Sequence, residues 1–357
     1  MATKELFDPQ PAATDGRSID RALGVLAGEG AQIRVHRPGD AFPIEPGTTT
    51  LVPTQAGGVD PEGPTYYGLP MLKSPVWKWV VPAYYWVGGA AGAASTLSMA
   101  AGLFGGRPLA RLARRARWLA AIGDSVGAVL LIYDLGRPLR FLNMLRTWRP
   151  SSPMSVGSWV LSTSGATNVA ALLLGDRRGL LGGLAQVAGI VGGLLGMPLA
   201  GYTAVLLGNT AVPVWLGGRR SLPLVFMCSG VAAAGSLMAL DAATPAEERA
   251  ASRYAVAGQL GELAATVAYE REVSRVPRAA RPLHQGAGGA LMLAATVLTG
   301  ASLAAALWPG GGKRRRRTAA LLGALGSLAL RFGVHEAGKA SAADPRASFA
   351  QQRAGAR

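Results

Sequence analysis

The sequence predicts an all-α integral membrane protein, an eight-helix transmembrane bundle with a polar N-terminal tail. Hydrophobic residues make up 50% of the 357-residue chain and charged residues only 16%, whereas soluble globular proteins carry about 25% charged residues. The mean hydropathy is positive, at +0.26. The charged residues also stand between long uncharged runs, and a helix of about 20 such residues spans the hydrocarbon core of a bilayer.

Eight apolar runs are long enough to cross a bilayer as helices. They lie at residues 80–104, 118–135, 156–174, 180–207, 222–240, 254–273, 287–308 and 318–337. Glycine recurs within these runs, and small residues allow helix backbones to approach closely in a membrane. Pro198 lies inside the long fourth run, which predicts a kink there or a broken segment before Pro213.

The apolar runs divide the chain into three parts. Residues 1–78 form a polar tail rich in proline and glycine, residues 79–340 form the transmembrane domain, and residues 341–357 form a polar C-terminal tail. The N-terminal tail lacks a basic stretch followed by an apolar one, so we expect no cleavable signal peptide. Residues 18–44 show weak apolar periodicity. One interpretation is a small helix and strand that dock on a partner, and the other is a loosely ordered tail.

The formal net charge of the chain is +16, which in a soluble protein would point to nucleic acid as the partner. Here the arginine clusters flank apolar runs. Membrane proteins keep topology signals and contacts to anionic lipids at such places. We therefore expect these charges to face the lipid bilayer, and we expect no nucleic acid partner.

Eight spans place both termini on one side of the membrane. The densest basic clusters, at residues 107–117 and 313–317, fall in loops on the other side, which the positive-inside rule assigns to the cytoplasm. The sequence thus predicts a multi-pass protein of the cell (inner, cytoplasmic) membrane with both termini outside. The arginines within residues 137–149 and the long tail without a signal peptide argue the other way.

Cysteine and histidine are scarce. Cys228 is the single cysteine, and the histidines are His36, His284 and His335. One thiol cannot form an intrachain disulfide, hold an iron–sulfur cluster or build a thiolate zinc site. The histidines provide no pair at one depth for a haem between helices. We expect no haem, cluster or metal in this chain, so any electrons it handles pass through a diffusing ligand or a partner chain.

The most informative stretch is residues 133–159, which read YDLGRPLRFLNMLRTWRPSSPMSVGSW. Asp134 stands where the second run leaves the membrane, and Arg137 lies three residues later, within reach of an ion pair. The following apolar and basic residues are typical of an amphipathic segment in the membrane interface. One interpretation is a basic interfacial linker. The other is a site at headgroup depth with an aspartate, an arginine and aromatic walls.

Three ionisable residues, Asp124, Glu262 and Arg331, lie deep within predicted spans. A charged group inside a membrane is costly, so each is a functional candidate. Glu262 and Arg331 can pair across two helices, which would leave Asp124 without an obvious partner. One interpretation is a buried ion pair that fixes helix register, and the other is a proton path.

Several motifs in the same order resemble the NrfD-type family, the polysulfide reductase membrane subunits. The stretch DLGRP with RFLNML and PSSPMSVGSW carries the resemblance most clearly. Further pieces are YYGLPMLKSPVWKW, PAYYWVGGAAGAAS, GYTAVLLGNTAVPVW and LRFGVHEAGKASAADP. Together they cover roughly residues 66–345, and the tail before them lies outside the resemblance.

The resemblance implies the membrane anchor of a respiratory complex. Such a subunit binds a quinone, menaquinone or ubiquinone, and holds no haem or iron–sulfur cluster of its own. It passes electrons between the quinone pool and an iron–sulfur subunit, which connects to a molybdopterin catalytic subunit. The chain would therefore act in quinone oxidation or reduction as part of a complex, and not as an enzyme alone.

The resemblance also implies roles for particular residues. Quinone-binding candidates are Tyr84, Tyr85, Trp159 and His335, the reaction candidates are Tyr133, Asp134 and Arg137, and the partner-docking candidates are Arg140, Arg146 and Arg149. Hydrogen-bond donors at the quinone carbonyls would stabilise developing charge, and Asp134, held ionised by Arg137, would relay a proton. The alternative role for the tyrosines is an aromatic belt, and for His335 a helix-end position.

Two other functions stay open at this point. One is a secondary transporter whose site is formed by Asp124, Glu262 and Arg331. The other is a structural anchor with a degenerate quinone site.

Overall fold

The computed structural model divides the chain into two units, Met1–Tyr66 and Tyr67–Arg357. The described residues are 18–20, 25–27, 72, 75, 77–134, 140–175, 177–308, 310 and 312–355. In the first unit, strands β1 (Ser18–Asp20) and β2 (Val25–Ala27) pair antiparallel. Apart from these six residues, the helix and strand expected over residues 18–44 lie outside the described residues.

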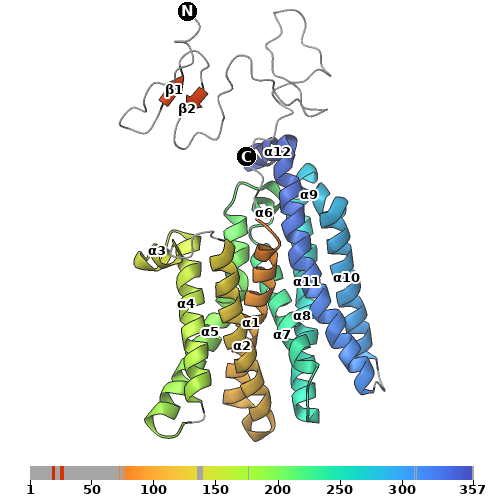
Figure 1. Ribbon diagram of the computed structural model, residues 1–357. Coiled ribbons are helices and arrows are strands. Elements are labelled where there is room, and N and C mark those ends of the chain that lie inside the picture. Colours follow the sequence, from red (N-terminus) through yellow and green to blue (C-terminus); the bar gives the residue numbers. More distant parts are fainter. Residues whose placement is uncertain are drawn as a thin grey trace, which may run out of the picture. The chain divides into compact units, whose positions relative to one another are not determined.

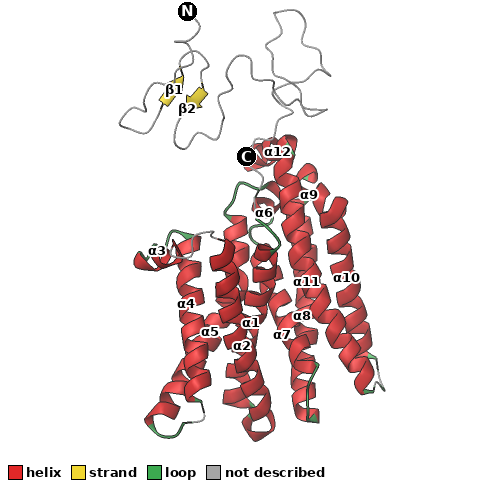
Figure 2. Cartoon of the chain, in the orientation of Figure 1, coloured by secondary structure: helices red, strands yellow, loops and turns green. Residues whose placement is uncertain are grey.

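The second unit is a helical bundle (Figures 1 and 2). Its described part contains eight long helices: α1 (Val80–Phe104), α2 (Gly106–Asp134), α4 (Pro153–Leu174), α5 (Leu180–Gly208), α7 (Leu222–Ala239), α8 (Pro245–Val273), α10 (Gly286–Leu307) and α11 (Lys313–Ala343). Four short helices are α3 (Arg140–Arg146), α6 (Pro213–Gly217), α9 (Pro277–His284) and α12 (Pro345–Gly355). The long helices alternate in direction, and all four short ones lie at the end of the bundle where α1 begins (Figure 1). We call this the α1 end, and the opposite one the basic end.

Each predicted apolar run coincides with one long helix to within one residue at its C-terminal end or is contained in it, and several helices are longer than the run. Helix α2 begins at Gly106 and α8 at Pro245, whereas the corresponding apolar runs begin only at residues 118 and 254. The reason is that a helical backbone continues through arginine-rich segments, whose long side chains carry their charges toward water. Hydropathy therefore locates the membrane core better than it locates helix ends.

Six of the long helices, α1, α2, α5, α7, α10 and α11, are long and apolar enough to cross a membrane. The chain is thus a multi-pass helical membrane protein. Helices α4 and α8 are not among these six: α4 contains several serines and threonines, and α8 begins and ends with charged residues. The count of eight spans therefore stays a prediction.

Prolines mark the beginnings and breaks of several helices. The helices α4, α6, α7, α8 and α9 have proline in their first turn, where no intrahelical N–H bond is lost. Helix α5 continues through Pro198 and ends at Gly208. The short α6 then begins at Pro213, so the chain has the broken segment expected before that residue.

Helix α1 lies at the centre of the bundle. It contacts α2, α5, α7 and α11, and close backbone approach makes this possible. A Cβ added at Gly92 would lie 3.1 Å from the Ala200 nitrogen and closer still to the carbonyl oxygen of Gly196. Only glycine fits where α1 and α5 cross so closely.

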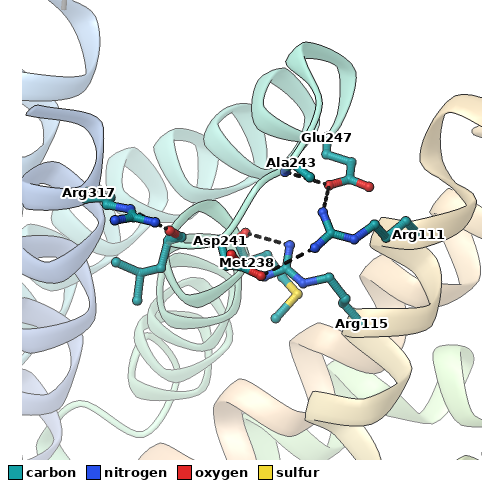
Figure 3. Close-up of polar contacts among 8 residues, drawn as sticks. Arg111, Arg115, Met238, Asp241, Ala243, Glu247 and Arg317 are labelled. Carbon is teal, nitrogen blue, oxygen red and sulfur yellow. Dashed lines mark hydrogen bonds and ion pairs between the residues drawn. The ribbon is translucent and has the colours of Figure 1, made fainter. Parts of the chain in front are cut away.

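Figure 3 shows how cations hold the turn between α7 and α8 at the basic end. Glu247, 1% exposed, accepts from Arg111 Nη1 at 3.1 Å and from the Ala243 N–H at 3.0 Å. Arg115 Nη1 donates to the carbonyl of Met238, and Arg317 Nε donates to the carbonyl of Leu240. Basic residues from α2 and α11 thus stabilise this turn, in addition to any role in topology.

We expect Gly92→Ile to lower the free energy of unfolding by about 1–3 kcal/mol, because the new side chain forces α1 away from α5. The matched control is Gly102→Ile on the same helix, where no atom lies within 4 Å of an added Cβ. Thermal unfolding of the detergent-purified protein measures both. Equal melting temperatures for the two variants would contradict the close crossing.

We expect Glu247→Gln to destabilise the fold by about 1–3 kcal/mol, because a buried acceptor of charged and backbone donors loses its charge. Asp241→Asn serves as the control. Asp241 also pairs with Arg111 and Arg115, but its side chain is 71% exposed, so its loss should cost less than about 1 kcal/mol. The same unfolding assay compares them, and a larger effect for Asp241→Asn would refute this assignment.

Candidate functional site

Aromatic rings surround a histidine at the α1 end of the bundle. The ring centroid of His335 lies 6.3 Å from that of Trp77, 6.3 Å from that of Trp215 and 6.2 Å from that of Tyr85. Trp77 and Trp215 stack on each other at 5.7 Å, and Tyr85 contacts Phe226 at 5.9 Å. We call these five residues the aromatic cluster.

Helix α6 positions Trp215 over α11. The indole Nε1 of Trp215 donates to the carbonyl of Val334 at 2.8 Å, and the hydroxyl of Tyr269 on α8 donates to the carbonyl of Val214 at 3.2 Å. Gly338 leaves the space on α11 that the ring of Trp215 occupies, since a Cβ there would overlap the ring. A five-residue helix is thereby fixed between α8 and α11.

His335 is 1% exposed. The backbone of Trp77 lies beside its ring, but neither ring nitrogen makes a hydrogen bond of ordinary geometry. Buried polar atoms in proteins are normally hydrogen-bonded. A buried imidazole whose ring nitrogens make no hydrogen bond of ordinary geometry, inside an aromatic enclosure, is therefore suited to a ligand with hydrogen-bonding oxygens.

Arg331 lies one helical turn before His335 on α11 and is also 1% exposed. Its Nη2 donates to the carbonyl of Phe226 at 2.6 Å, and its Cζ stands 3.9 Å from the centroid of the Phe226 ring, in a cation–π contact. Its Nε and Nη1 atoms have no hydrogen-bond partner. This buried positive charge can stabilise negative charge that develops on a molecule bound at the cluster.

Tyr84 and Tyr85 are both buried and point to different helices. Tyr85 lies within electrostatic reach of Arg331 and of Asp134. The hydroxyl of Tyr84 forms a short hydrogen bond with the hydroxyl of Tyr202 on α5. Tyr85 thus belongs to the cluster, whereas Tyr84, whose ring lies 6.2 Å from that of Tyr85, links the cluster to α5.

Asp134 and Tyr133 end helix α2 at the α1 end and are exposed. The charge of Lys78 acts on Asp134. Arg137 lies outside the described residues, so the ion pair between Asp134 and Arg137 stays a prediction. The exposure of Asp134 and its electrostatic contact with Tyr85 place a titratable group between the cluster and water.

An ion pair fixes the short helices at this end. Arg278 Nε of α9 donates to Asp344 Oδ2 at 2.7 Å, and the backbone N–H of Arg346 donates to Oδ1 at 3.0 Å. Burial by itself would raise the pKa of Asp344, but the hydrogen bonds and the charge of Arg278 outweigh it and hold this pKa below its usual value. The carboxylate therefore ties α9 and α12 to the end of α11.

Asp124 sits in a hydrogen-bond network of its own. Its Oδ2 accepts from Ser164 Oγ at 2.9 Å and from Asn168 Nδ2 at 2.8 Å, and Asn168 Oδ1 accepts from Ser95 Oγ at 2.7 Å. These residues belong to α1, α2 and α4. The network provides the partners that the sequence did not reveal for Asp124.

Glu262 and Arg331 do not form the direct ion pair that the sequence allowed. Glu262 Oε1 accepts from Thr299 Oγ1 at 2.9 Å, Arg331 donates to a backbone carbonyl, and Glu262 Oε2 has no partner of ordinary geometry. The two charges still act on each other electrostatically. Among the residues the structure describes, no group of three or more His, Cys, Asp or Glu could hold a metal ion.

A family model described as polysulfide reductase, NrfD_2, matches residues 64–343, well over half of the chain. The chain belongs to this NrfD-type polysulfide reductase family. No curated protein matches it. The matched range contains every residue of the aromatic cluster. The family resemblance indicated by the motifs is therefore confirmed over the residues that form the site. At the level of the family, the chain is a membrane subunit that anchors an oxidoreductase.

In this NrfD-type chain three further predicted residues, Trp159, Arg146 and Arg149, lie away from the aromatic cluster. Trp159 packs edge to face on Trp148 with ring centroids 6.1 Å apart and is 37% exposed, so it lies on the outer side of α4. Arg146 and Arg149 are exposed beside α3. The side chain of Arg140 lies outside the described part.

Sequence reasoning missed Trp77, Trp215, Phe226 and Tyr202 as members or neighbours of the NrfD-type site. Three of them stood in motifs that carried the resemblance, namely Trp77 in KSPVWKW and both Tyr202 and Trp215 in GYTAVLLGNTAVPVW. A tryptophan two residues after a proline was the available signal for the two tryptophans. It could not show which helix the indole would face.

Proposed function

We propose that this chain is the quinone-interacting membrane anchor of a respiratory molybdopterin oxidoreductase complex, which passes electrons between a docked iron–sulfur subunit and the quinone pool. The observation that carries the proposal is the aromatic cluster around His335, with the buried charge of Arg331 beneath it. Membership in the NrfD-type family supports a membrane anchor of an oxidoreductase. The quinone is our inference from the site, and the partner subunits are our inference from the family resemblance.

The residues present fit a quinone, menaquinone or ubiquinone. The bound group would supply the two-electron redox chemistry that this chain's side chains lack. Tyr85, Trp77 and Trp215 offer flat apolar walls for its ring, and His335 has two nitrogens that need hydrogen-bond partners. Arg331 and Tyr85 lie where they can stabilise negative charge on a carbonyl oxygen. Tyr84 supports Tyr85 from the side of α5.

Proton transfer to this site needs a titratable group that reaches water. Asp134 meets this need, because it is exposed and interacts electrostatically with Tyr85. Tyr133 precedes it at the exposed end of α2. We assign to Arg137 the task of keeping Asp134 ionised between proton transfers.

The partner would dock at the α1 end, close to the cluster. The segment around α3 presents the basic side chains of Arg146 and Arg149 there, and we include Arg140 in the same docking surface. Exposed cations at this end would steer an acidic surface of the iron–sulfur subunit toward the bundle. The short distance would favour electron transfer to the quinone.

The secondary transporter is the less favoured function. It requires one site shared by Asp124, Glu262 and Arg331. Instead, Asp124 is bonded within α1, α2 and α4, while Glu262 bonds to α10 and Arg331 to α7. We retain Glu262 and Arg331 as members of a proton path and regard Asp124 chiefly as the centre of a helix-fixing network.

We expect His335→Leu to reduce quinone-coupled turnover of the purified complex about 100-fold, because a donor to the quinone carbonyl is lost. The control is His284→Leu, which changes an exposed histidine on α9. Turnover is measured with a quinone analogue, and with an artificial dye that takes electrons directly from the catalytic subunit. Loss of quinone turnover with dye activity and subunit copurification intact supports the site, whereas unchanged quinone turnover refutes it.

We expect Asp134→Asn to abolish most quinone turnover while the complex still assembles, because the amide cannot carry a proton. Glu270→Gln, a change to a partly buried residue on α8, is the control. The complex is purified through a tag on this chain, and metal analysis and mass spectrometry then show whether its subunits have assembled. If Asp134→Asn turned over quinone normally, Asp134 would have no part in the proton transfer.

A further inference from the structure

A cavity of roughly 310 Å³ opens between α8, α10 and α11 at the basic end. Its mouth is lined by Glu248, Trp308, Arg315 and Arg316, which are charged or amphipathic residues. It lies at the end of the bundle opposite the aromatic cluster, and the proposed quinone site makes no use of it.

The cavity reaches the middle of helix α8. Its wall follows α8 from Glu248 to Gln259, eleven residues that extend about 16 Å along the axis. Helix α8 is 29 residues long, so Gln259 lies halfway along it. Empty cavities inside proteins are lined by apolar side chains, but the inner end of this one is polar.

Three polar residues form that inner end. Gln259 Nε2 donates to Ser302 Oγ at 2.9 Å and to Ser236 Oγ at 3.5 Å. Gln259 is only 1% exposed, yet its Oε1 has no hydrogen-bond partner. A buried acceptor without a partner is energetically costly. Water bound in a polar cavity of this size would satisfy it.

Glu262 continues the same polar row one turn deeper. It follows Gln259 by three residues on α8, and its partner Thr299 precedes Ser302 by three residues on α10, so both pairs share a helix face. The hydroxyl of Ser229 on α7 also acts on this carboxylate as a hydrogen-bond donor, but Glu262 Oε2 makes no hydrogen bond of ordinary geometry. The row of polar atoms therefore joins the cavity to the carboxyl group.

We propose that this cavity is an aqueous vestibule through which Glu262 exchanges protons with the side of the membrane that carries residues 313–317. Water in the vestibule gives a proton to Glu262 Oε2, and the hydroxide left behind is neutralised by a proton that passes along the water chain from the mouth. Only the use of these protons at the quinone site rests on the proposed function. The vestibule itself does not.

The charges at the mouth favour water over a phosphate group as the occupant. Arg316 pairs with Glu248, and Arg315 donates to the carbonyl of Trp308. Two of the three arginines that line the cavity are thus engaged within the protein. A lipid headgroup would have to compete with these bonds, whereas water can join them.

Cysteine accessibility in the full chain, within sealed vesicles of known orientation, tests the vestibule. In a Cys228→Ala background, Glu262→Cys and Ser302→Cys are treated with the membrane-impermeant sulfonatoethyl methanethiosulfonate from each side. Gly312→Cys, an exposed position near residues 313–317, reports which side is reached. The buried control is Ala295→Cys on α10, which is 1% exposed and does not line the cavity.

We expect both test positions to react from the side that labels Gly312→Cys, at least about 10-fold faster than Ala295→Cys. Adding Gln259→Leu, which fills the inner end, should slow labelling of Glu262→Cys about 10-fold or more. Labelling no faster than at Ala295→Cys, or only from the opposite side, would overturn the vestibule. So would labelling that begins only after a copurified acidic lipid is extracted.

A second measurement tests whether the protons are used. In the assembled complex, labelling Ser302→Cys should lower quinone turnover about fivefold or more relative to the same variant before labelling. Full labelling with unchanged turnover would overturn the proton route. If the complex showed no quinone activity at all, the proposed function would fail, while the accessibility results would still decide the vestibule.

Discussion

The close approach of α1 to its neighbours is the constraint on which the rest of the bundle depends. Gly92 and Gly196 let α1 and α5 meet backbone to backbone, and Gly230 brings α7 against the carbonyl of Gly89. In a bilayer such contacts, and not the hydrophobic effect, hold helices together. The same approach places Tyr85 beside His335, because α1, α7 and α11 converge at that level.

Polar groups inside the bundle fall into two networks with different character. Around Asp124, Ser164 and Asn168 bind one carboxylate oxygen, and the network joins three helices. Around Glu262, several polar atoms lack partners, and a cavity reaches toward them from the basic end. Asp124 Oδ1 also lacks a hydrogen-bond partner, so it is the cavity reaching toward Glu262, and not unsatisfied atoms alone, that distinguishes the second network and favours water there.

The two ends of the bundle have different chemistry. At the α1 end, the short helices hold tryptophan, tyrosine and histidine together, and exposed cations lie beside α3. At the basic end, arginines hold the turn between α7 and α8 (Figure 3) and line the mouth of the cavity. The chain therefore presents aromatic and histidine side chains at one end of the bundle and arginine side chains at the other.

The sequence by itself determined the helical membrane class, the positions of the apolar runs, the NrfD-type family and the candidacy of Tyr85, His335 and Arg331. Apolar run length, cysteine scarcity and ordered motifs are local properties, so they can be read without a fold. Only the tertiary structure decided that Trp215 faces His335, that Trp159 faces outward and that Glu262 bonds to Thr299. Membrane helices that are apolar on nearly every side carry little periodicity to show which face meets which neighbour, and close packing of distant segments settles that choice.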